Sequence, residues 1–220
     1  MKAIAIDKRI DDLRDKILLL GGMTEAAVAR GVRALTTRDS DLAEKVCLDD
    51  KSIDQMELEI DRLSIDILAT QPPTEHDLRL VVSVAKITPI LERIADHASS
   101  IAEAALILNN EPQISSYVDF SLMAKIAASM LREALDAFTA EDAEASREII
   151  RRDRVIDEHY HRVFRELVQL MVRKPETANG AARLLFVAKN LERIGDYVKD
   201  ICELNVYLRE AVFIKHSERY

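Results

Sequence analysis

The sequence is poor in the residues that define several protein classes. Among 220 residues there are two cysteines, five glycines, five prolines and no tryptophan, and aromatic residues make up 5%. Cys47 and Cys202 alone cannot build a disulfide-rich scaffold, and so few glycines and prolines exclude a collagen-like or low-complexity chain. Hydrophobic residues reach 48%, enough for a buried core, so we expect a folded protein of one domain or two small ones.

Acidic residues outnumber basic ones by 39 to 31, which gives a net charge of −8. This balance argues weakly against nucleic-acid binding, because phosphate contacts need a surface rich in Lys and Arg. Residues 1–16 contain no apolar core of signal-peptide length, and no run approaches the roughly 18 apolar residues of a membrane span. With two thiols that look unpaired, these features predict a cytoplasmic protein that reaches a membrane only through a partner.

Long windows rich in Ala, Leu, Glu, Arg and Ile carry apolar residues at every third or fourth position, which is the period of an amphipathic helix. We predict six helices, over residues 7–37, 40–70, 75–109, 116–139, 141–173 and 177–212. A 30-residue helix is about 45 Å long. Long helices of similar length are typical of an antiparallel bundle, so the predicted fold class is all-α.

Several residues are expected to cap, bend or interrupt these helices. Thr74 is expected to cap the third helix, with Asp77 in its first turn. Pro89 lies inside the third helix and should bend it, because proline removes one backbone hydrogen bond. Gly21 and Gly22 are expected to interrupt the first helix, either as a kink or as a place where another backbone approaches closely.

The chain also contains an internal duplication. Residues 91–103 read LERIADHASSIAE and residues 191–203 read LERIGDYVKDICE, with seven identities at an offset of 100. Residues 50–54 and 153–157 match at an offset of 103. A period near 100 is too long for a solenoid repeat. We therefore predict two related halves of three helices each, about residues 1–110 and 115–220.

Each half carries two pairs of carboxylates spaced four residues apart. These are Asp50 and Asp54, Glu92 and Asp96, Asp153 and Asp157, and Glu192 and Asp196. Such spacing puts both members of a pair on one helix face, where like charges repel. Asp50 and Asp153 also fall within apolar stripes, where an unpaired carboxylate is costly. Because carboxylate oxygens suit magnesium, calcium, manganese and iron, the eight residues are candidate metal ligands.

Other interpretations of these residues stay open. Arginines adjoin the acidic pairs, and charge on a helix usually marks a solvated, salt-bridged face. Asp200 extends the sixth-helix series as a possible further ligand, but its counterpart is Ser100. Glu158 and His161 form a single Glu-x-x-His, whereas a ferritin-like di-iron bundle needs two. We find no Gly-rich phosphate loop, nucleophile elbow or zinc-protease motif, and so predict no catalytic residue.

Together these features resemble the PhoU family of phosphate-specific transport system accessory proteins. The resemblance rests on the two ERI(A/G)D segments with their Asp-x-x-x-Asp partners, on residues 73–79 (PTEHDLR) and on residues 20–23 (LGGM), and it covers about residues 5–210. It implies two three-helix bundles side by side. It also implies that the eight carboxylates bind metal ions, often iron or zinc, with magnesium or manganese as further possibilities.

The resemblance further implies a regulator and not an enzyme. Members of the family keep the phosphate-starvation response off when phosphate is plentiful, and they modulate phosphate uptake. They link the ATPase subunit of the phosphate ABC transporter to a phosphate-sensing histidine kinase, and a homodimer is the expected assembly. Two other classes stay open, namely a carboxylate-bridged metalloenzyme of the helical-bundle type and a metal-free helical adaptor held by salt bridges.

Overall fold

A computed structural model gives the fold and describes residues 2–70, 73–114 and 120–214. Within that part of the chain it contains six α-helices, one short 3-10 helix and no β-strand. The elements are α1 (Lys2–Thr37), α2 (Ser40–Thr70), α3 (Glu75–Leu108), α4 (Phe120–Thr139), α5 (Ala143–Arg173), η1 (Pro175–Thr177) and α6 (Ala178–Glu210). The predicted all-α class with six long helices is therefore confirmed.

Most of the predicted helix bounds agree closely with the structure. The second helix matches at both ends, whereas α1 begins at Lys2, earlier than the predicted start at residue 7. The predicted start of the fourth helix, residue 116, lies outside the described residues. The 3-10 turn Pro175–Thr177 was not predicted, and it places Pro175 at the first position of a helical turn, where its missing N–H costs nothing.

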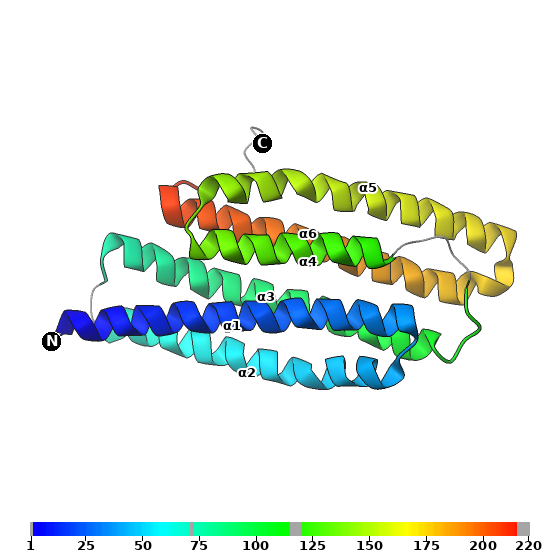
Figure 1. Ribbon diagram of the computed structural model, residues 1–220, viewed down its shortest axis with the longest axis horizontal. Helices are drawn as coiled ribbons and strands as arrows, with labels where there is room; N and C mark the ends of the chain where they lie inside the picture. Colours follow the sequence, from blue (N-terminus) through cyan, green and yellow to red (C-terminus); the bar gives the residue numbers. More distant parts are fainter. Residues whose placement is uncertain (1, 71–72, 115–119, 215–220) are drawn as a thin grey trace.

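The helices lie along the long axis of the molecule in two sets (Figure 1). Helices α1, α2 and α3 pack against one another, and so do α4, α5 and α6. Contacts between α3 and α6 and between α1 and α4 join the sets. Helices that follow one another along the chain run antiparallel (Figure 1).

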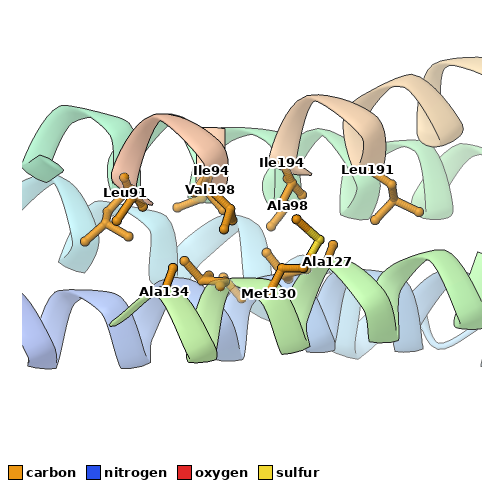
Figure 2. Packing of buried hydrophobic residues seen from close by; sticks show 14 of the residues in the cluster. Leu91, Ile94, Ala98, Ala127, Met130, Ala134, Leu191, Ile194 and Val198 are labelled. Atoms are coloured by element: carbon orange, nitrogen blue, oxygen red, sulfur yellow. The ribbon is translucent and has the colours of Figure 1, made fainter. Parts of the chain in front are cut away.

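A continuous hydrophobic core runs through both sets of helices. One cluster of buried apolar residues draws members from all six helices. Figure 2 shows its centre, where Ile94 of α3, Met130 of α4 and Ile194 of α6 come together. Small side chains such as Ala98 and Ala127 alternate with these larger ones and let the helices approach closely. The two related halves are thus packed against each other through apolar side chains.

Side chains accept hydrogen bonds from backbone N–H groups in the first turns of α3 and α5. Thr74 precedes α3, and its hydroxyl accepts a hydrogen bond from the backbone N–H of Asp77 at 3.1 Å, which confirms the predicted cap. Asp142 has the same role at α5, where its carboxylate accepts from the N–H of Ala145 at 3.0 Å. Both caps place an oxygen at the positive end of the helix.

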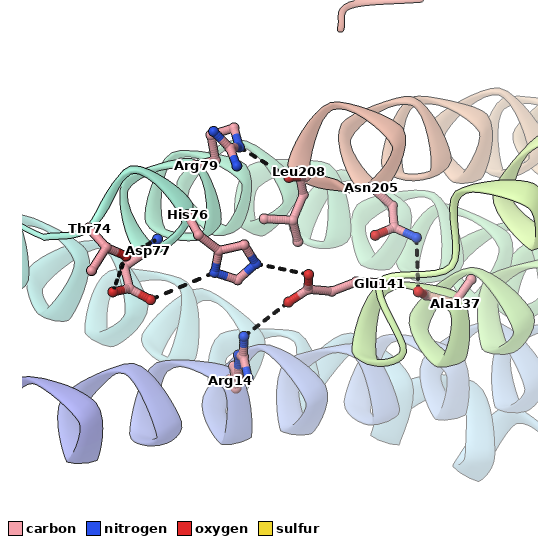
Figure 3. A network of polar contacts seen from close by, with 9 residues as sticks. All are labelled: Arg14, Thr74, His76, Asp77, Arg79, Ala137, Glu141, Asn205 and Leu208. Atoms are coloured by element: carbon pink, nitrogen blue, oxygen red, sulfur yellow. Dashed lines mark hydrogen bonds and ion pairs between the residues drawn. The ribbon is translucent and has the colours of Figure 1, made fainter. Parts of the chain in front are cut away.

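Polar contacts join the two sets of helices at one end of the molecule (Figure 3). Glu141 lies in the turn between α4 and α5 with φ of 51°. Its carboxylate accepts a hydrogen bond from Arg14 of α1 at 3.1 Å and lies 2.9 Å from Nε2 of His76 on α3. Buried Asn205 of α6 donates to the carbonyl oxygen of Ala137 at 2.9 Å, near the end of α4. These contacts supplement the shared core by tying the α4–α5 turn to three other helices.

Glycines of α1 lie where its neighbours approach closely. The helix is continuous through Gly21 and Gly22, so the expected interruption is wrong. A Cβ atom at Gly21 would lie 2.5 Å from the side chain of Leu135 on α4. A Cβ atom at Gly31 would lie 2.8 Å from the backbone oxygen of Ala98 on α3. The close backbone contact is therefore at Gly31, nine residues beyond the pair that the sequence indicated.

No helix in residues 2–70, 73–114 and 120–214 is both long and apolar enough to cross a membrane.

We predict that Gly31→Ala destabilises the protein by about 1–3 kcal/mol, because the methyl group would press on the Ala98 backbone, which cannot rotate away. Gly22→Ala is the matched control on the same helix. A Cβ atom there has no neighbour within 4 Å, so the substitution should gain up to about 1 kcal/mol of helix propensity. Urea unfolding followed by circular dichroism measures both. Equal stability of the two variants would contradict the close packing of α1 on α3.

Candidate metal centres

The four candidate ligands of the first half lie across the contact between α2 and α3. Asp50 and Asp54 come from α2, and Glu92 and Asp96 come from α3. Burial raises the pKa of Asp50, and the charges of Asp96 and Asp54 raise it further, whereas the hydroxyl of Ser99 opposes these effects. The structure thus brings the four carboxylates into one electrostatic neighbourhood.

A fifth carboxylate that sequence analysis missed belongs to the same group. Burial raises the pKa of Glu57, and the charges of Asp61, Asp54 and Asp96 raise it further. Glu57 follows Asp54 by three residues, a spacing that shares a helix face and could have identified it. We call Asp50, Asp54, Glu57, Glu92 and Asp96 the first-half cluster.

The charge of the first-half cluster is not balanced by ion pairs. None of its carboxylates lies within ion-pair distance of a Lys, Arg or His side chain in the described residues. Burial, followed by the charges of Asp96, Glu57 and Asp54, raises the pKa of Glu92 to about 7, although Arg93 opposes the shift. A group of neighbouring carboxylates of this kind is stabilised by protons or by a cation.

In the second half, lysines pair with three of the four candidate carboxylates. Asp153 of α5 is only 6% exposed, and Nζ of Lys199 on α6 lies 2.5 Å from its Oδ2 atom. The same ammonium lies 3.2 Å from Oδ1 of Asp196. Burial raises the pKa of Asp153, and the hydrogen bond and charge of Lys199 oppose this. Burial lowers the pKa of Lys199, but the two carboxylates outweigh it and leave the pKa above its usual value.

A second lysine forms an ion pair with Glu192. Nζ of Lys189 lies 2.5 Å from Oε2 of Glu192 and 5.3 Å from the ring centre of Tyr160. Asp157 lies close enough to raise the pKa of Asp153. We call Asp153, Asp157, Glu192 and Asp196, together with Lys189 and Lys199, the second-half cluster.

Asp200, the possible further ligand, is the residue after Lys199 on α6. It lines a separate pocket between α3 and α6, together with Lys86, Glu203 and Phe213. His97 follows Asp96 on α3 and contacts α6. Nδ1 of His97 lies 3.0 Å from Oδ1 of Asn190, so this ring bridges α3 and α6.

The side chains as they stand do not enclose a metal ion. Within the described ranges, no three His, Cys, Asp or Glu side chains are arranged closely enough to hold one. The first-half cluster nevertheless has the chemistry of a site for a hard cation, because its donors are carboxylate oxygens that lie half-buried or exposed without basic partners. Side-chain rotation would have to bring these oxygens to the usual ligand distances of about 2.0–2.6 Å.

Comparison with known proteins identifies the family. The PhoU domain model matches the chain twice, over residues 17–105 and 120–204. The chain belongs to the PhoU family. It is 36% identical to the Pseudomonas aeruginosa protein named phosphate-specific transport system accessory protein PhoU homolog, over 94% of this chain and 86% of that protein. It is 32% identical to Escherichia coli PhoU, over 94% of this chain and 86% of that protein.

Solved structures of PhoU proteins share the fold. The crystal structure of PhoU from Pseudomonas aeruginosa superposes with a TM-score of 0.90 at 36% identity and covers 94% of this chain and 99% of that one. The phosphate transport system regulatory protein PhoU from Streptococcus pneumoniae gives a TM-score of 0.89 at 31% identity, over 94% and 98% of the two chains. The two PhoU matches contain the first-half and second-half clusters respectively, so the duplicated carboxylates lie within the family's own domain.

The raised pKa of Glu92 predicts how metal-free stability depends on pH. Between its ordinary value of 4.5 and about 7, Glu92 is ionised in the unfolded chain but protonated in the fold. The stability from this group is therefore present below pH 4.5 and is lost as the pH rises through 7.

We expect Glu92→Gln to be more stable than the natural chain at pH 8 by about 1 kcal/mol, a value reduced for partial exposure, and nearly equal to it at pH 4.5. Urea unfolding in EDTA at the two pH values measures the difference. Glu192→Gln is the control, because Lys189 already neutralises Glu192 and the substitution should bring no gain at pH 8. A pH-independent effect of Glu92→Gln would count against the repulsion within the first-half cluster.

Proposed function

We propose that this chain is a regulatory adaptor that represses the phosphate-starvation response and modulates phosphate uptake when phosphate is abundant. The observation that carries this proposal is membership of the PhoU family over both matched domains. The names of its relatives support it, because they describe accessory and regulatory proteins of phosphate transport. In this proposal the chain acts in the cytoplasm and reaches the membrane only through its partners.

The proposed partners are the ATPase subunit of the phosphate ABC transporter and a phosphate-sensing histidine kinase, with the chain acting as a homodimer. An exposed apolar stripe on α5 supports a role in protein binding. Phe164, Val168 and Val172 are spaced by four residues and are 44%, 36% and 76% exposed. Neighbouring apolar side chains of this kind are a common feature of protein interfaces.

The proposed role of metal begins with the first-half cluster. A cation there would neutralise the clustered charges of Asp50, Asp54, Glu92 and Asp96 and would hold α2 against α3. All-oxygen donors favour iron, manganese or magnesium over zinc, which more often takes nitrogen and sulfur ligands. The partners would then recognise a helical surface whose shape depends on bound cation.

Deletion of the gene tests the regulatory role. We expect a phosphate-starvation reporter to turn on in phosphate-rich medium, and the intact gene supplied on a plasmid should silence it again. An empty plasmid is the control. A reporter that stays silent in the deletion strain, with no second gene of this family in the genome, would contradict the proposal.

Substitution of the first-half cluster tests the role of metal. In the natural chain, Mn²⁺ at a hundredfold excess over its dissociation constant should raise the free energy of unfolding by about 2.7 kcal/mol. Asp54→Asn combined with Asp96→Asn should abolish this gain and should fail to silence the reporter. Asp11→Asn with Asp12→Asn, two exposed carboxylates of α1, is the matched control and should behave like the natural chain.

Reporter silencing and Mn²⁺ binding together distinguish the regulatory role from the role of the metal. If the Asp54 and Asp96 variant silences the reporter fully but binds no Mn²⁺, a metal-free adaptor replaces the metal-dependent one. If that variant binds Mn²⁺ as tightly as the natural chain, the first-half cluster is not the metal site.

A further inference from the structure

Three of the positions at which the halves of the duplication differ bear on the charge around their carboxylates. Lys199 corresponds to Ser99 at the offset of 100, and Lys189 corresponds to Pro89. At the offset of 103, Tyr160 corresponds to Glu57. At these three positions the second half gains two ammonium groups and loses one carboxylate relative to the first.

The lysine ammonium occupies the position where a cation would be needed. Nζ of Lys199 lies between the α5 and α6 carboxylates, 2.5 Å from Asp153 and 3.2 Å from Asp196. In the first half, the corresponding residue is Ser99, whose hydroxyl lies near the corresponding Asp50. The two positions are equivalent in sequence, and each lies near the first carboxylate of its half. A neutral hydroxyl stands in one half where a positive charge stands in the other.

The remaining contacts follow the same division. Lys189 holds Glu192 at 2.5 Å and lies over Tyr160, whereas no ammonium can extend from Pro89 toward Glu92. Arg193 adds an ion pair to Asp196 at 3.4 Å. The first-half cluster holds five carboxylates without an ion pair in the described residues, and the second-half cluster holds four carboxylates with two lysines.

We propose that the chain binds metal in its first half only, because the Lys199 ammonium is a built-in cation that bridges Asp153 and Asp196 and excludes a metal ion from the second half. The proposal refines the proposed metal role and rests on it. It also departs from the expectation that both halves carry equivalent metal sites. Each half has four carboxylates at matching positions, but only the second half has lysines paired with them. Lys199 would then hold α5 and α6 together at all times through its ion pairs, whereas α2 and α3 would be held together only when an ion is bound.

Mn²⁺ titration of the purified full-length chain, stripped with EDTA, tests the proposal by calorimetry and by metal analysis after dialysis. We expect the natural chain to bind Mn²⁺. The double variant Asp54→Asn with Asp96→Asn should lose this binding, whereas Asp153→Asn with Asp157→Asn should bind as much as the natural chain. Lys199→Ser makes the second half resemble the first and should roughly double the bound Mn²⁺. Adding Asp153→Asn with Asp157→Asn to Lys199→Ser should abolish that increase. Lys199→Arg keeps the charge and is the matched control, with no increase expected.

A reciprocal substitution keeps the test decisive if Lys199→Ser does not fold. Ser99→Lys places an ammonium beside Asp50, and we expect it to weaken Mn²⁺ binding at least as much as the loss of one carboxylate. Circular dichroism and thermal unfolding of each variant confirm that the helices are intact.

The outcomes separate the inference from the proposal on which it rests. One outcome is that the natural chain binds Mn²⁺ in both halves, so that Asp54→Asn with Asp96→Asn and Asp153→Asn with Asp157→Asn each remove half of it. This outcome would overturn the inference but leave the proposed metal role standing. No Mn²⁺ binding by the natural chain, with binding created by Lys199→Ser, would support exclusion by lysine while removing the proposed metal role. If the Lys199→Ser variant is folded but binds no more Mn²⁺ than the natural chain, the inference is overturned.

Discussion

The contact between α3 and α6 is the constraint on which the rest of the molecule depends. These helices carry the duplicated segments, and Leu91 and Ile94 of one helix, like Leu191 and Ile194 of the other, are fully buried. Each such side chain contributes roughly 1.5–3 kcal/mol relative to an exposed one. Because successive residues on a helix are turned by about 100°, Leu91 in the core directs Glu92 to the side, toward α2. The same packing that joins the two halves therefore brings carboxylates against their neighbouring helices.

Carboxylates beside a core need a counter-charge, and the two halves meet this need differently. In the second half, burial of Asp153 acts against its charge, and the Lys199 ammonium at 2.5 Å compensates. In the first half no ion pair in the described residues compensates, and the pKa of Glu92 is raised to about 7. Duplication has thus preserved the acidic residues and the helical frame that positions them, while the neutralising groups have diverged.

Local patterns predict much of this fold, and pairwise contacts explain most of what they miss. Helical periodicity gave the bounds 40–70 of α2, and side-chain chemistry gave the Thr74 cap, because both depend on neighbours in sequence. The match between halves identified the eight candidate ligands, but it passed over Glu57, whose counterpart Tyr160 is not acidic. The pairing of Lys199 with Asp153 joins residues 46 positions apart, and only the packing of α5 on α6 reveals it.

The asymmetry between the halves limits how a cation could act on the proposed adaptor. A ligand shifts a conformational equilibrium only by its difference in affinity between two states. With the second half held by its own ammonium, we expect such a difference between α2 and α3, where the charges of Asp54 and Glu57 act on Glu92. Helix α3 also packs on α6, so a shift of α3 would change its contacts with α6 in the shared core. Under this assignment the α4–α6 set is the fixed part of the molecule, and the first three helices are the part that responds to cation supply.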